Sequence, residues 1–172
     1  MENIKSGVKL QRLFRVECYR KGEPIWAEKA HNIVTNEGLD RSLDVMVGGK
    51  AQISTWYCGL VETNTTATAT MTYDVPIFTE STAYDEATRP AYVEATATAG
   101  SVTNAANKAT FTINATKTMY GAALFSKSTK GDHPAGADNV LYCYAKFSAE
   151  RAVVDDDVIN LTYVVTSADD AV

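Results

Sequence analysis

The sequence contains little of what a chemically active site requires. Only two of its 172 residues are histidines and three are cysteines. The cysteines, at positions 18, 58 and 143, form no Cys-x-x-Cys pair of the kind that zinc sites use. Neither a Gly-x-Ser-x-Gly elbow nor a Gly-x-x-x-x-Gly-Lys phosphate loop occurs. We therefore expect no catalytic residue, no cofactor, no metal and no enzyme activity.

Long apolar runs are also missing. No stretch of about 18 apolar residues could cross a membrane, and the start Met-Glu-Asn-Ile-Lys lacks the apolar segment of a secretion signal. The net charge of -5 disfavours unspecific attraction to nucleic acid or to an anionic membrane. We expect a chain that is made in the reducing bacterial cytoplasm, keeps its cysteines free and buried, and binds neither nucleic acid nor membrane.

The two histidines and one acidic run are the remaining candidates for chemistry. His31 lies in a strand-like segment, which favours a partly buried structural histidine. His133 lies in a glycine-rich loop beside Asp132. The run 155–157, three aspartates, could offer carboxylates to calcium, but it lacks the EF-hand frame and lies between two predicted strands. We interpret it as an acidic turn.

The polar residues favour a mainly β fold. Threonine, which is β-branched and favours extended chain, recurs through the middle of the sequence. Alternating or continuous apolar patterns predict eight strands, over residues 10–19, 25–34, 52–61, 91–99, 109–115, 118–126, 140–147 and 158–166. This number of strands favours one β-sandwich domain over residues 10–172, of which a jelly roll is one form. Residues 1–9 read as a basic arm, and residues 62–90 as a long excursion without periodicity.

One short helix is predicted near residues 36–47. Thr35 or Asn36 can cap its start, and Gly48-Gly49 supplies a stop. Gly38 costs roughly 1 kcal/mol relative to alanine, so tertiary contacts must support the helix. Three apolar residues recur at a spacing of four and form a single stripe, which we expect to pack on the sheet: Leu39, Leu43 and Val47.

Five dispersed segments resemble a group of small structural proteins of tailed-bacteriophage virions. They are His31–Asp40 with Leu43-Asp44, Thr55–Leu60, Tyr84–Pro90, Tyr120–Leu124 and Asp157–Tyr163, and their order also matches. The resemblance covers about residues 10 to 166. It departs from the family at Cys58, where valine is usual, and at Val75–Glu80. It implies a cement or decoration subunit on the outer capsid surface, with the major capsid protein and itself, as a dimer or trimer, as partners.

The candidate contacts to these partners lie in the basic arm and in the excursion: Lys5, Lys9, Tyr73, Tyr84 and Arg89. For Arg89, an internal ion pair with Asp85 or Glu86 is the alternative to exposure in solvent. Two other functions stay open at this point. One is a tail or baseplate component, which copy number would separate from cement. The other is a glycan-binding, receptor-recognising module, which needs exposed aromatic side chains.

Overall fold

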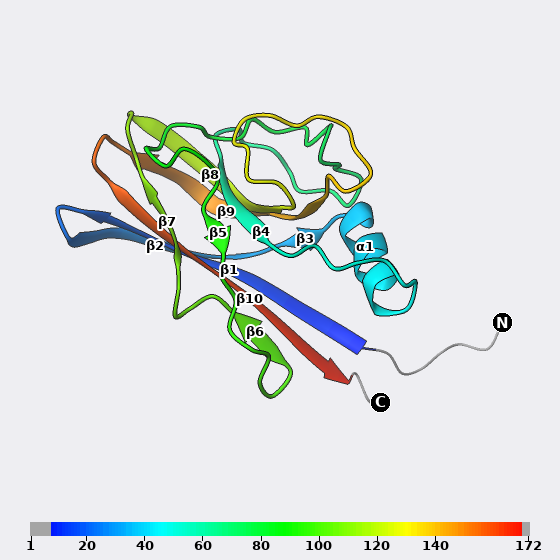
Figure 1. Ribbon diagram of the computed structural model, residues 1–172. Helices are drawn as coiled ribbons and strands as arrows, with labels where there is room; N and C mark the ends of the chain where they lie inside the picture. The colour runs from blue at the N-terminus through cyan, green and yellow to red at the C-terminus, as the bar shows by residue number, and fades with distance from the viewer. Residues whose placement is uncertain (1–7, 170–172) are drawn as a thin grey trace.

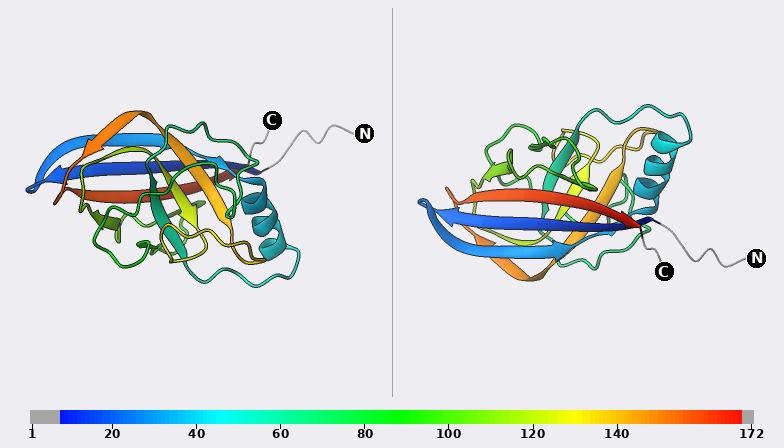
Figure 2. Two further views of the ribbon diagram at one scale, coloured as in Figure 1. Left: turned by 90° about the horizontal axis from the view of Figure 1, so that it is seen from above. Right: turned by 90° about the horizontal axis from the view of Figure 1, so that it is seen from below.

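The computed structural model describes residues 8–169, which form two antiparallel sheets packed face to face (Figures 1 and 2). The first sheet has the order β2-β1-β10-β6, and β7 pairs with another stretch of β10. Its strands are β1 (Val8–Arg20), β2 (Glu23–His31), β6 (Ser101–Thr103), β7 (Ala109–Thr112) and β10 (Val158–Asp169). The second sheet has the order β3-β9-β8-β4-β5. Its strands are β3 (Ile33–Val34), β4 (Trp56–Val61), β5 (Ala91–Tyr92), β8 (Lys117–Phe125) and β9 (Leu141–Val153). The predicted β-sandwich is confirmed.

The core between the sheets follows from the alternation of side chains along the strands. Phe14, Val16 and Cys18 of β1 are fully buried, as the sequence pattern predicted. Across the same sheet, Ile159 and Leu161 of β10 are fully buried as well. Because β1 lies between β2 and β10, its backbone is paired on both sides, which makes it the central support of this layer.

The three cysteines belong to this core, as predicted, and all are free. Burial, with a smaller contribution from Asp157, raises the pKa of Cys18 to about 11. Burial also raises the pKa of Cys143 to about 12 and that of Cys58 further still. The thiols therefore stay protonated and act as small apolar side chains.

The second sheet is covered on both faces. Its inner face meets β1 and β10, whereas residues of the excursion pack over its outer face (Figure 1). The second apolar cluster joins Met71 and Phe78 of the excursion to Phe125 of β8 and Tyr144 of β9. Two-sided burial explains why β4 is apolar at successive positions, and residues 58–61 are all buried, as predicted for a central strand. The strand begins at Trp56, however, and not at residue 52 as predicted.

The helix α1 (Asn36–Met46) lies at one end of the sandwich, opposite the β1–β2 turn (Figures 1 and 2). Thr35 caps it: its hydroxyl accepts a hydrogen bond of 3.0 Å from the amide of Gly38. The expected packing of the apolar stripe is wrong, since Gly38 and Arg41 are buried instead. A Cβ at residue 38 would lie 2.5 Å from the carbonyl oxygen of Tyr142, so glycine permits the close approach of α1 to β9.

Three further expectations need correction. His31 is exposed, because it ends β2 at the edge of the sheet. The strand predicted over 91–99 contains only Ala91–Tyr92, beyond which the chain leaves the sheet. The arm is shorter than residues 1–9, because β1 begins at Val8, and Lys9 pairs with Ala168.

The acidic run forms the turn between β9 and β10, as predicted. Asp157 is fully buried, and its carboxylate accepts hydrogen bonds of 2.7 and 2.9 Å from the guanidinium of Arg20. It also accepts a bond of 2.9 Å from the amide of Val154, which closes the turn. The hydrogen bonds from Arg20 hold the pKa of Asp157 below its ordinary value against the opposing effect of burial.

Candidate functional site

The predicted contact residues of the excursion are buried within the chain. Tyr73, Tyr84 and Arg89 are each at most 2% exposed. Their side chains are used by the fold itself, so they offer no surface to a partner in this conformation. Lys5 lies outside the described residues, and Lys9 is placed only by its backbone pairing.

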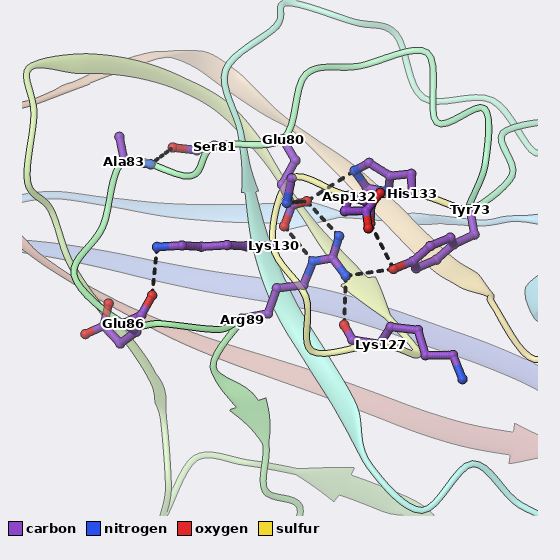
Figure 3. Close-up of polar contacts among 11 residues, drawn as sticks. Tyr73, Glu80, Ser81, Ala83, Glu86, Arg89, Lys127, Lys130, Asp132 and His133 are labelled. Atoms are coloured by element: carbon purple, nitrogen blue, oxygen red, sulfur yellow. Dashed lines mark hydrogen bonds and ion pairs between the residues drawn. The ribbon is translucent and has the colours of Figure 1, made fainter. Parts of the chain in front are cut away.

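Arg89 is the centre of a buried polar cluster (Figure 3). Its guanidinium forms a two-point ion pair with the carboxylate of Glu80, at 2.6 and 2.7 Å. The same group donates to the hydroxyl of Tyr73 at 3.0 Å and to the carbonyl of Lys127 at 2.7 Å. The guanidinium carbon also lies 4.0 Å from the ring centre of Phe125. Of the two alternatives for Arg89, an internal ion pair or exposure in solvent, the structure has the ion pair, but its partner is Glu80 rather than Asp85 or Glu86.

Besides Arg89, the carboxylate of Glu80 has two partners in the loop that follows β8. It accepts a hydrogen bond of 2.8 Å from the amide of Gly131, and the imidazole Nε2 of His133 lies 3.2 Å away. Burial alone would raise the pKa of this carboxyl, but the contacts from Arg89 and His133 outweigh it and hold the pKa below its ordinary value. The ion pair of Arg89 and Glu80 is therefore charged at neutral pH. Its hydrogen bonds are made to other groups of the same chain.

The side chain of Lys130, in the loop after β8, contacts the C-terminal part of the excursion. The ammonium of Lys130 donates to the carbonyls of Tyr84 and Glu86, both at 2.7 Å, and lies 4.1 Å from the ring centre of Tyr84. The carboxylate of Glu86 accepts hydrogen bonds from the backbone and hydroxyl of Thr112. The geometry fits a clamp that holds the excursion and the loop after β8 against the second sheet.

The apolar side of α1 is exposed to solvent. Four side chains at helical spacing are exposed: Leu39 by 42%, Leu43 by 59%, Met46 by 76% and Val47 next to the helix by 83%. We call these four residues the helix face. Because large exposed apolar surfaces are uncommon on soluble proteins, this side of α1 is a candidate interaction surface. The signal was in the sequence as a stripe, but the pattern could not tell which side of α1 meets the sheet.

Beside the helix face, an apolar groove opens between the two sheets. It has a volume of about 360 Å³, which lies within the range of ligand-binding clefts. We call it the inter-sheet groove. Residues from α1 and from both sheets line it: Val45, Met46, Trp56, Tyr92, Tyr142 and Val165. Because Met46 belongs to the helix face as well, the two surfaces are continuous.

Two charged side chains reach the inter-sheet groove. Arg41 lines it from α1, but its guanidinium is neutralised by Asp138 at 2.5 Å and also donates to the carbonyl of Ala137. Glu94 lines the groove from the segment after β5, and no ion pair to it is found in residues 8–169. Arg12 adds a positive charge beside the groove, since its guanidinium carbon lies 6.0 Å from the ring centre of Tyr142, so the charges around the groove nearly balance.

No family model matches the chain, and no curated protein matches it. Within residues 8–169, no group of three histidine, cysteine, aspartate or glutamate side chains could hold a metal ion. The single helix of that part of the chain is not long and apolar enough to cross a membrane.

Proposed function

We propose that this chain is a structural protein of a tailed-bacteriophage virion, a cement subunit that binds the outer surface of the capsid and stabilises the lattice of the major capsid protein. The helix face is the observation that carries the proposal. It places four exposed apolar side chains on a rigid scaffold, as an adhesive contact requires. The resemblance of five sequence segments to virion structural proteins supports the same function.

The buried ion pair is consistent with a subunit whose fold must withstand the pressure on the capsid. The buried clamp of Arg89 and Glu80 fixes the longest segment without strands, so the outer face of the second sheet does not depend on a loose loop. Many weak contacts suffice for a cement subunit, since binding to several capsid subunits at once raises the effective concentration. Association of the subunit with itself, as a dimer or trimer, would add to this effect.

Binding of purified protein to capsid shells that lack it tests the proposal. Leu43→Lys places a charge in the centre of the helix face, and we expect it to weaken binding by at least about thirtyfold, as for loss of an interface hot spot. Ile25→Lys is the matched control, because Ile25 is 45% exposed on β2, away from α1. Equal binding of both variants and of the unmodified protein would contradict the role of the helix face.

A glycan-binding module is the second candidate, because aromatic rings line the inter-sheet groove. Trp56 and Tyr142 meet edge to face with ring centres 5.2 Å apart, and such rings also stack on sugars. A glycan array separates the candidates. Sugar binding that is lost in Trp56→Ala, together with no binding to shells, would favour the module over the cement protein.

A further inference from the structure

We infer that the inter-sheet groove receives a second copy of this chain, through residues 75–77 of the excursion. We call these three residues, Val75, Pro76 and Ile77, the excursion tip. The contact adds to the proposed function the surface by which the subunit associates with itself. It rests on that function for its role in the virion, but it needs no capsid and can be measured in solution.

The excursion tip is an exposed apolar turn with a strained backbone. Val75 is 58% exposed and Ile77 is 55% exposed. Ile77 has a φ of 53°, which is an outlier for a β-branched residue. Strain of this kind concentrates in segments that bind or switch. The two exposed side chains of the tip are therefore candidates for a contact.

Hydrogen bonds and buried neighbours fix the excursion tip. The amide of Val75 donates to the hydroxyl of Thr72 at 3.2 Å. On the two sides of the tip, buried Tyr73 and Phe78 hold the chain over the outer face of the second sheet (Figure 1). The hydroxyl of Tyr73 is bound in turn by Arg89 at 3.0 Å. The tip is thus preorganised, which lowers the entropy cost of binding.

The inter-sheet groove is the complementary surface on the same chain. Apolar side chains dominate its walls: Val45, Met46, Trp56, Val102, Leu124 and Val165. Its volume of about 360 Å³ is at the small end for clefts that hold a whole ligand, which fits a few inserted side chains. The groove opens between the sheets, whereas the tip lies over the outer face of the second sheet. The tip of one copy must therefore enter the groove of another.

The charges beside the two surfaces fit this docking. Asp74, which precedes the tip, is exposed and forms no ion pair within residues 8–169. In that part of the chain the guanidinium of Arg12 beside the groove is also unpaired, and its Nε is buried without a hydrogen-bond partner. Asp74 of one copy can therefore pair with Arg12 of the next.

The acidic residue of the groove does not oppose this pairing. Arg12 belongs to β1, on one side of β10. Glu94 precedes Ala95, whose amide donates to the carbonyl of Thr103 in β6, on the other side of β10. A tip docked with its aspartate toward Arg12 thus keeps the two carboxylates apart, and exposed Glu94 stays hydrated.

A contact between two different surfaces cannot close as a two-fold dimer. It closes as a ring where the rotation between copies permits, and otherwise continues as a filament. Of the two forms of self-association expected from the sequence, the trimer, which is a ring, is therefore favoured over the dimer.

Sedimentation equilibrium of the purified protein, without capsid shells, tests the contact. We expect assembly beyond a dimer, and Ile77→Lys should raise the dissociation constant at least about thirtyfold, as for loss of an interface hot spot. Ile25→Lys, the same change at a 45% exposed position of β2, should raise it less than about threefold. Ile77→Gly removes the strain together with the side chain, so it should weaken assembly without lowering the midpoint of thermal unfolding.

An exchange of charges tests the orientation of the docked copies. Asp74→Arg and Arg12→Glu should each weaken assembly alone, whereas an equimolar mixture of the two should restore it, because every contact between unlike copies then pairs opposite charges. Circular dichroism checks the fold of each variant. If Arg12→Glu does not fold, Ile77→Lys against Ile25→Lys decides the outcome.

Three results would overturn the contact: a protein that stays monomeric at about 1 mM, equal association of Ile77→Lys and Ile25→Lys, or folded charge variants whose mixture does not assemble. If such a protein still binds capsid shells, the cement function stands without the contact. Assembly with the expected properties, but no binding to shells, would support the contact and overturn the cement function.

Discussion

Removal of the Arg89 side chain should destabilise the protein strongly. Arg89→Met keeps an aliphatic side chain over Phe125 but leaves the carboxylate of Glu80 with two contacts, the amide of Gly131 and the imidazole of His133. The carboxylate stays out of reach of water, since its side chain is 1% exposed. Breaking a buried ion pair by removing one partner costs about 3–5 kcal/mol. We expect a loss of unfolding free energy in that range at pH 7.

The size of this loss should depend on pH. Because Arg89 holds the pKa of Glu80 below its ordinary value, the pair contributes stability that is present above the ordinary glutamate pKa of about 4.3 and is lost as pH falls through the folded value. In Arg89→Met the buried carboxyl takes up a proton more readily. The difference between the two proteins should therefore shrink as pH is lowered from 7 to 4.

Urea unfolding, followed by the fluorescence of the two tryptophans and by circular dichroism, measures both effects. Lys108→Met is the control, because it breaks the exposed pair with Glu17 and should cost less than about 1 kcal/mol. The double variant Arg89→Met with Glu80→Leu should lose less stability than Arg89→Met alone, since no charge stays buried. A loss below about 1 kcal/mol for Arg89→Met, or a difference that grows in acid, would refute the reasoning.

Two further predictions concern the helix and the thiols. Gly38→Ala should lower stability by about 1–3 kcal/mol despite the better helix propensity of alanine, because its Cβ would press on the carbonyl of Tyr142. Thermal unfolding measures this loss. Unchanged or raised stability would contradict the close approach of α1 to β9. The three cysteines should not react with a thiol reagent in the native protein, because they are buried and their pKa values are raised: Cys18, Cys58 and Cys143. All three should react in urea. Rapid labelling of any of them in the native protein at pH 8 would contradict the packing.

Much of the fold could be predicted because local patterns agree with it. The middle parts of most of the long strands, the cap at Thr35 or Asn36, the buried cysteines and the acidic turn all follow from residue type and spacing. The pairing of β1 with β10 could not be predicted, because it joins segments some 150 residues apart without any local signal.

The surfaces were predicted less well, since exposure depends on partners that sequence does not show. Tyr73 and Arg89 were expected to be available to partners because the excursion lacks periodicity. Isolated β-bridges and buried polar contacts nevertheless hold the excursion in place without regular strands. The stripe with Leu43 at its centre was expected to face the core. In the structure Gly38 and Arg41 are the buried residues of α1, and Leu43 is exposed. An amphipathic pattern gives the apolar side of a helix, and the structure is needed to say what that side meets.

Cryo-electron microscopy of capsid shells with and without the added protein tests the cement function most directly. We predict hundreds of ordered copies on the outer surface, each with the helix face around Leu43 against the capsid subunits. Shells that show no added density, or protein found in a few copies at the tail, would contradict the account.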